Sequence, residues 1–476
     1  MGVKVAKFGG SSVADALQIG KIKNIIENDP DIHYVVVSAP GKRFSDDSKV
    51  TDLLYLCKAH IEHNLPYQQI FQVICDRFMA VEVNLGVNVG LKEEFEEIRK
   101  NLEAGASADY IASRGEHLNA MLIAAYLGFD FVDSSRIVRF DEKGRFMEDL
   151  TNKEIAEELK HHERAVIPGF YGAKVDGTIK TFSRGGSDIT GALVARAVGA
   201  DVYENWTDVS GFLMADPRIV KDPKPISTVS YKELRELSYI GASVLHEDAI
   251  YPARIANIPI NIRNTNEPEN PGTMITSEPA KLEEGQIIAG IAGSKDFTVI
   301  TMYKALLSSE RGFIRKMSGV LEDFDIPIEH IPSGVDTLSV VISNKQLGGK
   351  LEDILDEFER QLKPDHMEVS DDIALIATVG AGMSLRTGVS AKLFTALAEK
   401  KVNIRMIDQG SSEMNIIVGV ENKDFETAIR AIYGAFVSYR KWGGQSVKRI
   451  DFDLLPALHH TLRVRADHCN AGKSKK

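Results

Sequence analysis

The sequence predicts an α/β protein in which an open, mainly parallel sheet is sandwiched by helices and is followed by two smaller α+β modules of βαββαβ type. Two observations lead to this prediction. Up to about Ile262, short β-branched runs alternate with longer helical stretches, which is typical of a parallel sheet with helices on both faces. Beyond that point, a helix–strand pattern occurs twice, with Gly312 and Gly388 as equivalent positions 76 residues apart.

The elements of the first part can be placed by their β-branched or helical spacing. Ligands bind outside the carboxyl ends of the strands in sheets of this kind. Strands are expected at Val3–Phe8, His33–Ser38, Ala165–Phe170, Val202–Trp206 and Pro259–Ile262. Helices are expected at Leu17–Asn28, Val50–Asn64, Glu93–Ala104, Ser113–Leu127 and Ile189–Ala197.

The stretch Asn264–Gly285 is rich in Asn, Pro, Glu and Gly and is expected to be a loop before a domain boundary. In the repeat, Lys316 and Ile328 correspond to Lys392 and Ile404, although two unrelated amphipathic helix–strand pairs would look similar by chance. The expected domains are 1–285, 286–370, 371–438 and a tail at 439–476. The first strand of 286–370 is open to assignment to either module, and the basic tail is expected to be mobile or an appended extension.

Composition excludes several classes of protein. A chain of 476 residues suggests two to four domains, and a net charge of −11 argues against non-specific binding to nucleic acid or anionic membranes. No apolar run approaches the length of a membrane span, and no secretory signal is recognisable. The cysteines Cys57, Cys75 and Cys469 are odd in number and far apart. They favour a reducing, cytoplasmic location over a disulfide framework.

Two glycine turns carry the strongest chemical signal. The first is Lys7-Phe8-Gly9-Gly10-Ser11-Ser12, and the second is Phe182-Ser183-Arg184-Gly185-Gly186-Ser187-Asp188. Each has the order strand, glycine turn, hydroxyl residue and helix start, which directs backbone N–H groups at an anion such as phosphate. Because each turn also carries a cation, the pair predicts a site that holds a phosphate chain from two sides.

The charged residues of these turns have structural explanations as well as functional ones. Lys7 is suited to reach a phosphoryl group as a mobile point charge, but a surface lysine beside a tight turn has the same pattern. Asp188 is either a helix N-cap or a carboxylate that orients Lys7 or helps to hold Mg²⁺. The functional explanation is favoured because Arg184, Ser187 and Asp188 share one turn.

Two further groups predict contacts with a substrate. One group, expected at the start of a helix, is Ser113-Arg114-Gly115-Glu116-His117. Glu116 is there either because the helix dipole favours an acidic residue in the first turn or because it binds a substrate ammonium group. Trp206-Thr207-Asp208-Val209-Ser210-Gly211, followed by Asp216-Pro217-Arg218, comes after a strand and is suited to wrap a nucleotide. Asp-Pro-Arg is also common as a plain turn.

In order and spacing, these four motifs resemble those of the aspartokinases, over residues 1 to about 438. The resemblance implies an amino-acid-kinase fold followed by two ACT domains. It implies transfer of the γ-phosphoryl group of ATP to the β-carboxylate of L-aspartate, which gives 4-phospho-L-aspartate on the way to lysine, threonine and methionine. A carboxylate needs no general base for this attack, so positioning and charge compensation are what the site must supply.

The resemblance also assigns roles to individual residues. Lys7 would stabilise the transferring phosphoryl group and Asp188 would orient Lys7; Arg184 and Glu116 would bind the α-carboxylate and α-ammonium of aspartate. The expected substrate-binding residues are Ser38, Ala39, Thr51, Glu116, Arg184 and Ser187. The residues expected to bind ATP, which would come with Mg²⁺, are Lys7, Gly9, Gly10, Ser11, Thr207, Asp208, Leu213 and Arg218. No protein metal site is expected.

Two departures from the family pattern affect the nucleotide. Many aspartokinases have Gly-Ala-Lys-Val-Leu-His with the lysine on the nucleotide, whereas this chain has Ser243 in that place. A tyrosine often found near the nucleotide base is Leu213 here. Both changes leave catalysis intact in principle and alter the details of ATP binding.

The ACT resemblance implies feedback inhibition by an amino acid. The expected effector positions are Gly312, Phe313, Ile314, Ile328 and Glu329. Glu329 stands where lysine-sensitive members have an acidic residue, so L-lysine is the first choice. Threonine, alone or with lysine, is an alternative effector. Glu329 is alternatively only an exposed strand residue with no role in effector binding. Pairing of ACT modules implies a homodimer or a tetramer, and the chain is too short to include a fused homoserine dehydrogenase.

Two rival functions follow from the same residues. Another kinase of this fold would phosphorylate glutamate, acetylglutamate, UMP or carbamate, but those kinases lack tandem C-terminal modules. A catalytically silent amino-acid sensor would use the modules alone. The presence of Lys7, Glu116, Arg184 and Asp188 argues against the sensor, whereas Ser243 slightly favours it.

Overall fold

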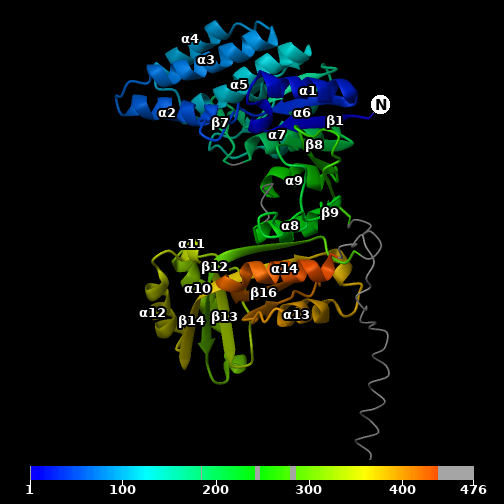
Figure 1. Cartoon of the computed structure of the whole chain (residues 1–476). Coiled ribbons are helices and arrows are strands. Elements are labelled where there is room, and N and C mark those ends of the chain that lie inside the picture. Colours follow the sequence, from blue (N-terminus) through cyan, green and yellow to red (C-terminus); the bar gives the residue numbers. More distant parts are fainter. Residues whose placement is uncertain (1, 184, 242–246, 279–285, 438–476) are drawn as a thin grey trace, which may run out of the picture. The chain divides into compact units, whose positions relative to one another are not determined.

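The computed structural model of the chain describes residues 2–183, 185–241, 247–278 and 286–437 (Figure 1). Residues up to Val437 belong to one compact unit. The expected tail lies outside the described residues, as do Arg184 and Ser243.

An eight-stranded sheet organises the first part of the chain. Its strand order is β3-β5-β2-β1-β8-β10-β11-β9. The β10–β11 pair is antiparallel and the other pairs are parallel, so the predicted fold class is confirmed. The strands are β1 (Lys4–Phe8), β2 (Ile32–Val37), β3 (Asp130–Phe131), β5 (Ala165–Pro168), β8 (Val202–Thr207), β9 (Thr228–Ser230), β10 (Ile260–Asn264) and β11 (Thr273–Thr276).

Helices cover both faces of this sheet. Successive side chains of a strand point to opposite faces, and here buried apolar side chains lie on both faces. In β1, Val5 packs in one hydrophobic cluster and Ala6 packs in the other. The cluster on the Ala6 face includes residues of α1 (Ala16–Asn28), α2 (Val50–Glu62), α3 (Gln68–Leu85), α4 (Leu91–Glu103) and α5 (Ala108–Leu127). The cluster on the Val5 face includes residues of α6 (Glu148–Leu159), α7 (Gly186–Val198) and α9 (Glu247–Ile255).

Two local predictions for this part were wrong. Helix α5 begins at Ala108 rather than Ser113, because Ser107 caps it by accepting a hydrogen bond from the Tyr110 amide at 3.1 Å. Glu116 therefore lies inside the helix, where the N-terminal dipole does not favour it. The expected loop after β10 contains strand β11, whose β-branched residues follow a left-handed Gly272 with φ 67°.

The second part of the chain is built on one five-stranded sheet, in the order β13-β12-β14-β16-β15. Strands β12 (Gly290–Tyr303) and β14 (His366–Val379) pair antiparallel along their length, so the two repeated units share a continuous sheet. The remaining elements are β13 (Thr337–Ser343), β15 (Met406–Asp408), β16 (Asn415–Glu421), α10 (Phe313–Asp323), α12 (Leu351–Leu362), α13 (Val389–Glu399) and α14 (Phe425–Phe436).

The internal repeat is visible in the backbone. Gly312 and Gly388 cap α10 and α13 in the left-handed region, with φ of 81° and 83°. The strand predicted after each helix forms as β15 in the second unit, but in the first unit isolated bridges from His330 to Val341 and from Ser333 to Leu338 take its place. Pro327 and Pro332 flank this stretch, and proline lacks the N–H that a strand ladder requires.

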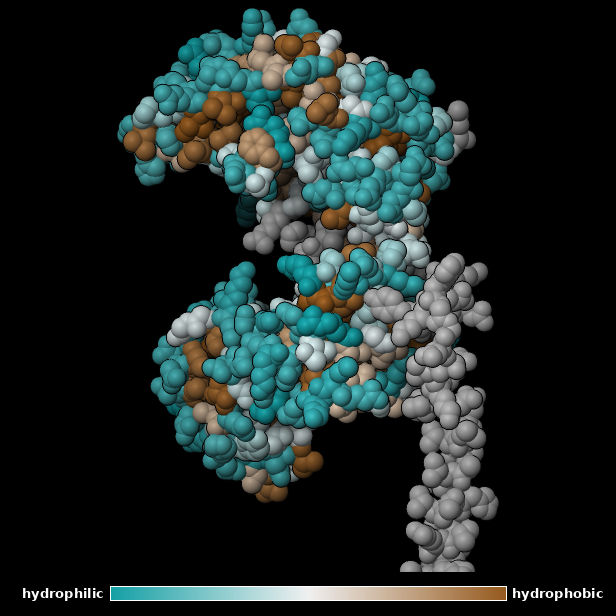
Figure 2. Space-filling view, in the orientation of Figure 1, coloured by the Kyte–Doolittle hydropathy of each residue, from teal (hydrophilic) through white to brown (hydrophobic). Residues whose placement is uncertain are grey.

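Hydrophilic side chains cover most of the face shown in Figure 2. Among the described helices, none combines the length and apolar composition needed to cross a bilayer. Cys57 and Cys75 are buried free thiols, and Cys469 lies outside the described residues.

Candidate active site

The turns after β1 and β2 touch each other at the carboxyl edge of the large sheet. The Gly41 amide donates to the carbonyl oxygen of Gly10 at 2.8 Å. A Cβ atom on Gly41 would lie 2.6 Å from the carbonyl carbon of Gly10, so only glycine fits at this contact. The Gly9 amide donates to the carbonyl oxygen of Trp206 at 3.0 Å. This amide is therefore already used in joining β1 to β8, which corrects the expectation that it faces a phosphate.

Replacing Gly41 with alanine is expected to destabilise the protein by about 1–3 kcal/mol, because the backbone of the neighbouring turn must shift. Gly20→Ala is the matched control, since Gly20 lies in α1 with no atom within 4 Å of its added Cβ. The control is expected to be neutral or slightly stabilising. Thermal and urea unfolding measure both effects, and equal stability of the two variants would contradict the prediction.

Lys7 and Asp188 form an ion pair at the end of this turn. Lys7 Nζ lies 2.7 Å from Asp188 Oδ1, and the lysine side chain is only 9% exposed. Asp188 lies in the first turn of α7, whose N-cap is Gly185 with φ 60°, so Asp188 does not serve as an N-cap. Its carboxylate instead forms an ion pair with the ammonium group of Lys7.

Asn205 belongs to this cluster and was missed by the sequence analysis. It is the direct neighbour of Lys7 in the β1–β8 register. Its Nδ2 donates to Asp188 Oδ1 at 2.7 Å, so Lys7 and Asn205 hold the same carboxylate oxygen. No local pattern in the sequence indicated this, because Asn205 reaches the cluster only through the register of β1 against β8.

Glu116 is a buried carboxyl group at the same edge of the sheet. The residue is 5% exposed, and it accepts a hydrogen bond from the backbone of Ala39. Gly115 allows this approach, since a Cβ there would lie 2.8 Å from the Cβ of Ala39. Glu116 Oε2 has no hydrogen-bond partner among the described residues. Burial raises the pKa of Glu116 to about 8, and a cationic ligand beside it would favour the ionised carboxylate.

The other predicted substrate residues surround this edge. The carbonyl oxygen of Ser38 accepts from Asn119 Nδ2 at 2.8 Å, which ties the end of β2 to α5. Thr51 is half-buried in the first turn of α2. Ser187 lies in the first turn of α7 and is close to Gly169, since a Cβ on Gly169 would lie 2.7 Å from the Cα of Ser187. Arg184 precedes this turn in the sequence and lies outside the described residues.

A buried polar network lies next to Glu116 on α5. His117 lies between Asp133 and Glu94, at 3.5 Å and 3.7 Å from their carboxylate oxygens. The Tyr171 hydroxyl donates to Asp133 at 2.9 Å. Burial lowers the pKa of His117, but the hydrogen bonds to Asp133 and Glu94 outweigh it and the net shift is upward. This network holds α5, and therefore Glu116, against the elements around it.

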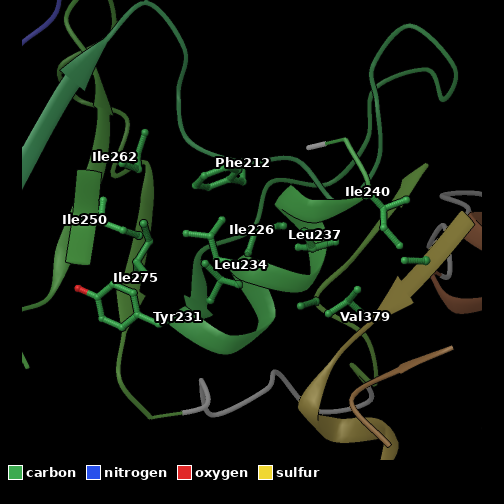
Figure 3. Packing of buried hydrophobic residues seen from close by; sticks show 14 of the residues in the cluster. Phe212, Ile226, Tyr231, Leu234, Leu237, Ile240, Ile250, Ile262, Ile275 and Val379 are labelled. Carbon is green, nitrogen blue, oxygen red and sulfur yellow. The ribbon is translucent and has the colours of Figure 1, made fainter. Parts of the chain in front are cut away.

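A separate cavity of about 1000 Å³ adjoins the loop that follows β8. Its lining includes the predicted nucleotide residues Asp208, Leu213 and Arg218. Arg218 is bound to Asp216 at 2.6 Å. Phe212, also in the lining, packs near Ile226 and Leu237 of the hydrophobic cluster around α8 (Tyr231–Tyr239) (Figure 3). The loop therefore has a rigid apolar support.

The predicted effector positions lie around α10. Gly312 caps this helix and Ile314 is exposed, whereas the side chain of Phe313 is buried in the hydrophobic cluster. Ile328 packs against that cluster. The carboxylate of Glu329 accepts a hydrogen bond from the Tyr239 hydroxyl, and burial together with this contact raises the pKa of Tyr239 to about 12.

Comparison with known proteins agrees with this architecture. The profile of the amino acid kinase family matches residues 2–264, and that of the ACT domain matches residues 376–436. The chain is 37% identical to aspartokinase 3 of Bacillus subtilis over 451 residues, which covers 91% of this chain and 98% of that protein.

Solved structures of relatives are also similar. The crystal structure of Clostridium acetobutylicum aspartate kinase has a TM-score of 0.86 and 51% identity, covering 92% of this chain and all of that one. Escherichia coli aspartokinase III with aspartate and ADP has a TM-score of 0.69 and 26% identity, covering 91% and 99% of the chains. Lysine-sensitive aspartokinase 3 of Escherichia coli is 27% identical over 457 residues, which covers 90% of this chain and 98% of that protein. This chain belongs to the amino acid kinase family and, within it, to the aspartokinases, which are ATP-dependent kinases with regulatory ACT domains.

Proposed function

We propose that this enzyme transfers the γ-phosphoryl group of ATP to the β-carboxylate of L-aspartate and produces 4-phospho-L-aspartate. The observation that carries the proposal is the ion pair of the buried Lys7 with Asp188 at the glycine turn. At the same sheet edge, Glu116 Oε2 has no hydrogen-bond partner within the part of the chain that the structure describes. The Lys7 ammonium is suited to contact a transferring phosphoryl group, and the Glu116 carboxylate is suited to bind the ammonium group of an amino acid.

The chemistry follows from these positions. The β-carboxylate of aspartate is ionised at neutral pH and attacks without a general base. Lys7 compensates the charge on the transferring group, Glu116 holds the α-ammonium, and Arg184 receives the α-carboxylate as the family resemblance implies. These contacts align the nucleophile with the phosphorus atom.

Mg²⁺ is expected to arrive with ATP. Such an ion is held mainly by phosphate oxygens and water, with one or two protein carboxylates. Asp188 would supply a carboxylate, and the bound ion would neutralise charge on the phosphates.

The test is ATP-dependent hydroxamate formation, in which hydroxylamine traps the acyl phosphate. Aspartate is expected to give product and glutamate is not. Product from glutamate alone would assign a different amino-acid kinase. Absence of product from both, with an amino acid still bound, would identify a sensor.

Inhibition by L-lysine is proposed from Glu329 and from the similarity to a lysine-sensitive relative. Glu329→Ala is expected to raise the inhibition constant for lysine at least tenfold, because a charge-assisted contact to the ligand ammonium is lost. Hydroxamate formation with lysine or threonine present measures this. Unchanged inhibition by lysine would remove Glu329 from the effector site, and inhibition by threonine alone would assign that amino acid. The ACT modules are proposed to form the contact of a homodimer or tetramer.

A further inference from the structure

We propose that the second half of the chain completes the nucleotide site, with Lys295 of β12 as a nucleotide-binding residue. This rests on the proposed function, in which ATP occupies the cavity bordered by Asp208 and Arg218.

Three segments supply most of the lining of that cavity, which also includes Gly241 and Asn264. One wall is the loop after β8, with Asp208, Leu213 and Arg218. The others come from the N-terminal half of β12, through residues 291–295, and from the start of α14, through Phe425 and its neighbours. The volume of about 1000 Å³ is at the upper end of small-molecule sites. A ligand that fills it touches both halves of the chain.

A bulge in β12 determines where Lys295 lies. The β12–β14 register shifts between Ser294 and Phe297, and Asp296 has a left-handed φ of 69°. Asn422 fixes the bulge, since its Oδ1 accepts from the Asp296 amide at 3.3 Å and its Nδ2 donates to the Asp296 carboxylate at 3.0 Å. Bulges often redirect a side chain toward a functional site. Here the bulge places Lys295 in the cavity lining.

Phe425 completes this wall. It is the first residue of α14 and is buried. A Cβ on Gly293 would lie 2.6 Å from Phe425 Cε2, so the glycine is required for the ring to pack against β12. Lys295 Nζ lies 5.3 Å from the centroid of this ring, within the range of a cation–π contact. The ring therefore holds the lysine side chain in place beside the cavity.

The charge of Lys295 is available to a ligand. Arg218 is paired with Asp216, and Glu426 is paired with Arg430 at 3.0 Å. Lys295 forms no ion pair with the residues that the structure describes, and it is exposed. An ammonium group of this kind, next to an apolar cavity, suits the polar and anionic parts of a nucleotide.

The experiment compares three variants of the full chain. Lys295→Met keeps the apolar stem and removes the charge, and it is expected to weaken Mg·ADP binding and raise the KM for ATP about tenfold. The kcat and the KM for aspartate are expected to stay unchanged. Lys423→Met is the matched control, because Lys423 is an exposed lysine paired with Glu421 outside the cavity lining. Arg218→Met tests the nucleotide site itself. Calorimetry with Mg·ADP and hydroxamate kinetics give the constants.

The outcomes separate this proposal from the function on which it rests. Wild-type binding that is weakened by Arg218→Met and Lys295→Met, but not by Lys423→Met, supports the proposal. Weakening by Arg218→Met alone would overturn it and leave the nucleotide site in place. Equal weakening by both lysine variants would also overturn it, as a general charge effect. Absence of Mg·ADP binding by the wild-type chain would overturn the proposed function and this inference together.

Discussion

The Lys7→Ala enzyme is expected to form product about 10³-fold more slowly than the wild type, with little change in the KM for aspartate. Lys7 Nζ is the buried cation at the glycine turn, held 2.7 Å from Asp188. Phosphoryl transfer depends on charge compensation at the transferring group, and losing one preorganised donor costs about 10²–10³ in kcat. The measurement is kcat by hydroxamate formation at saturating ATP and aspartate.

Lys4→Ala provides the matched control for this variant. Lys4 lies on the same strand three residues earlier and pairs with Asp29 at 2.6 Å, away from the turn. Its loss is expected to leave kcat within about twofold, because its ion pairs with Asp29 and with Glu204, the latter at 3.7 Å, involve neither Lys7 nor Asp188. Unchanged product formation by Lys7→Ala would show that another cation stabilises the phosphoryl group. A similar loss in both variants would indicate a damaged strand.

Much of the fold was predictable because local signals agree with the tertiary structure. The five strands predicted for the first part of the chain all form, since their β-branched residues suit a sheet buried on both faces. The repeat anchored at Gly312 and Gly388 was predictable because both positions require a left-handed backbone. Of the two glycine turns, the second has a left-handed glycine, Gly185 with φ 60°, whereas Gly9 in the first turn is extended.

The unpredicted features depend on contacts between distant segments. Asn205 joins the Lys7 site only through the parallel register of β1 and β8, which one sequence does not reveal. The hydrogen bond of the buried Glu116 to the backbone of Ala39 depends on the packing of Gly115 against Ala39. The cavity wall from β12 and α14 likewise requires the two halves of the chain to be packed. Local sequence patterns were sufficient to predict the types of residue at the site, whereas long-range packing determines which residues contact one another.

Glu116→Gln tests the substrate end of the site and is expected to raise the KM for aspartate about 10²-fold. The amide keeps the shape of the side chain but cannot pair as an anion with the α-ammonium, and charged hydrogen bonds contribute about 1.5–3 kcal/mol each. The KM for ATP is expected to change little. Initial rates at varied aspartate and saturating ATP give the comparison.

The pH dependence of the wild type and of Glu116→Gln separates a role of Glu116 in binding the substrate ammonium from a purely structural role. Burial raises the pKa of Glu116 to about 8 in the free site, so the carboxyl must lose a proton before it pairs with an ammonium. For the wild type, kcat/KM for aspartate is therefore expected to rise up to tenfold per pH unit below about pH 8 and then to level off. Glu116→Gln is expected to lack this rise, and a parallel profile in both proteins would contradict the role.

The same pKa shift predicts an opposite effect on stability. Between the ordinary pKa of a glutamate, 4.5, and about 8, the folded state holds a proton on Glu116 that the unfolded chain releases, so the free energy of unfolding falls as pH rises through this window. The slope is about 1.4 kcal/mol per pH unit. Glu116→Gln has no charge to bury, so it should unfold at a higher temperature than the wild type at pH 8 while binding aspartate poorly.

A wild type as stable as the variant at pH 8 would mean that the carboxylate has a partner in the free enzyme. A less stable variant would mean that the carboxylate holds the fold together, whereas a more stable one shows that Glu116 is kept for its ligand at the expense of stability.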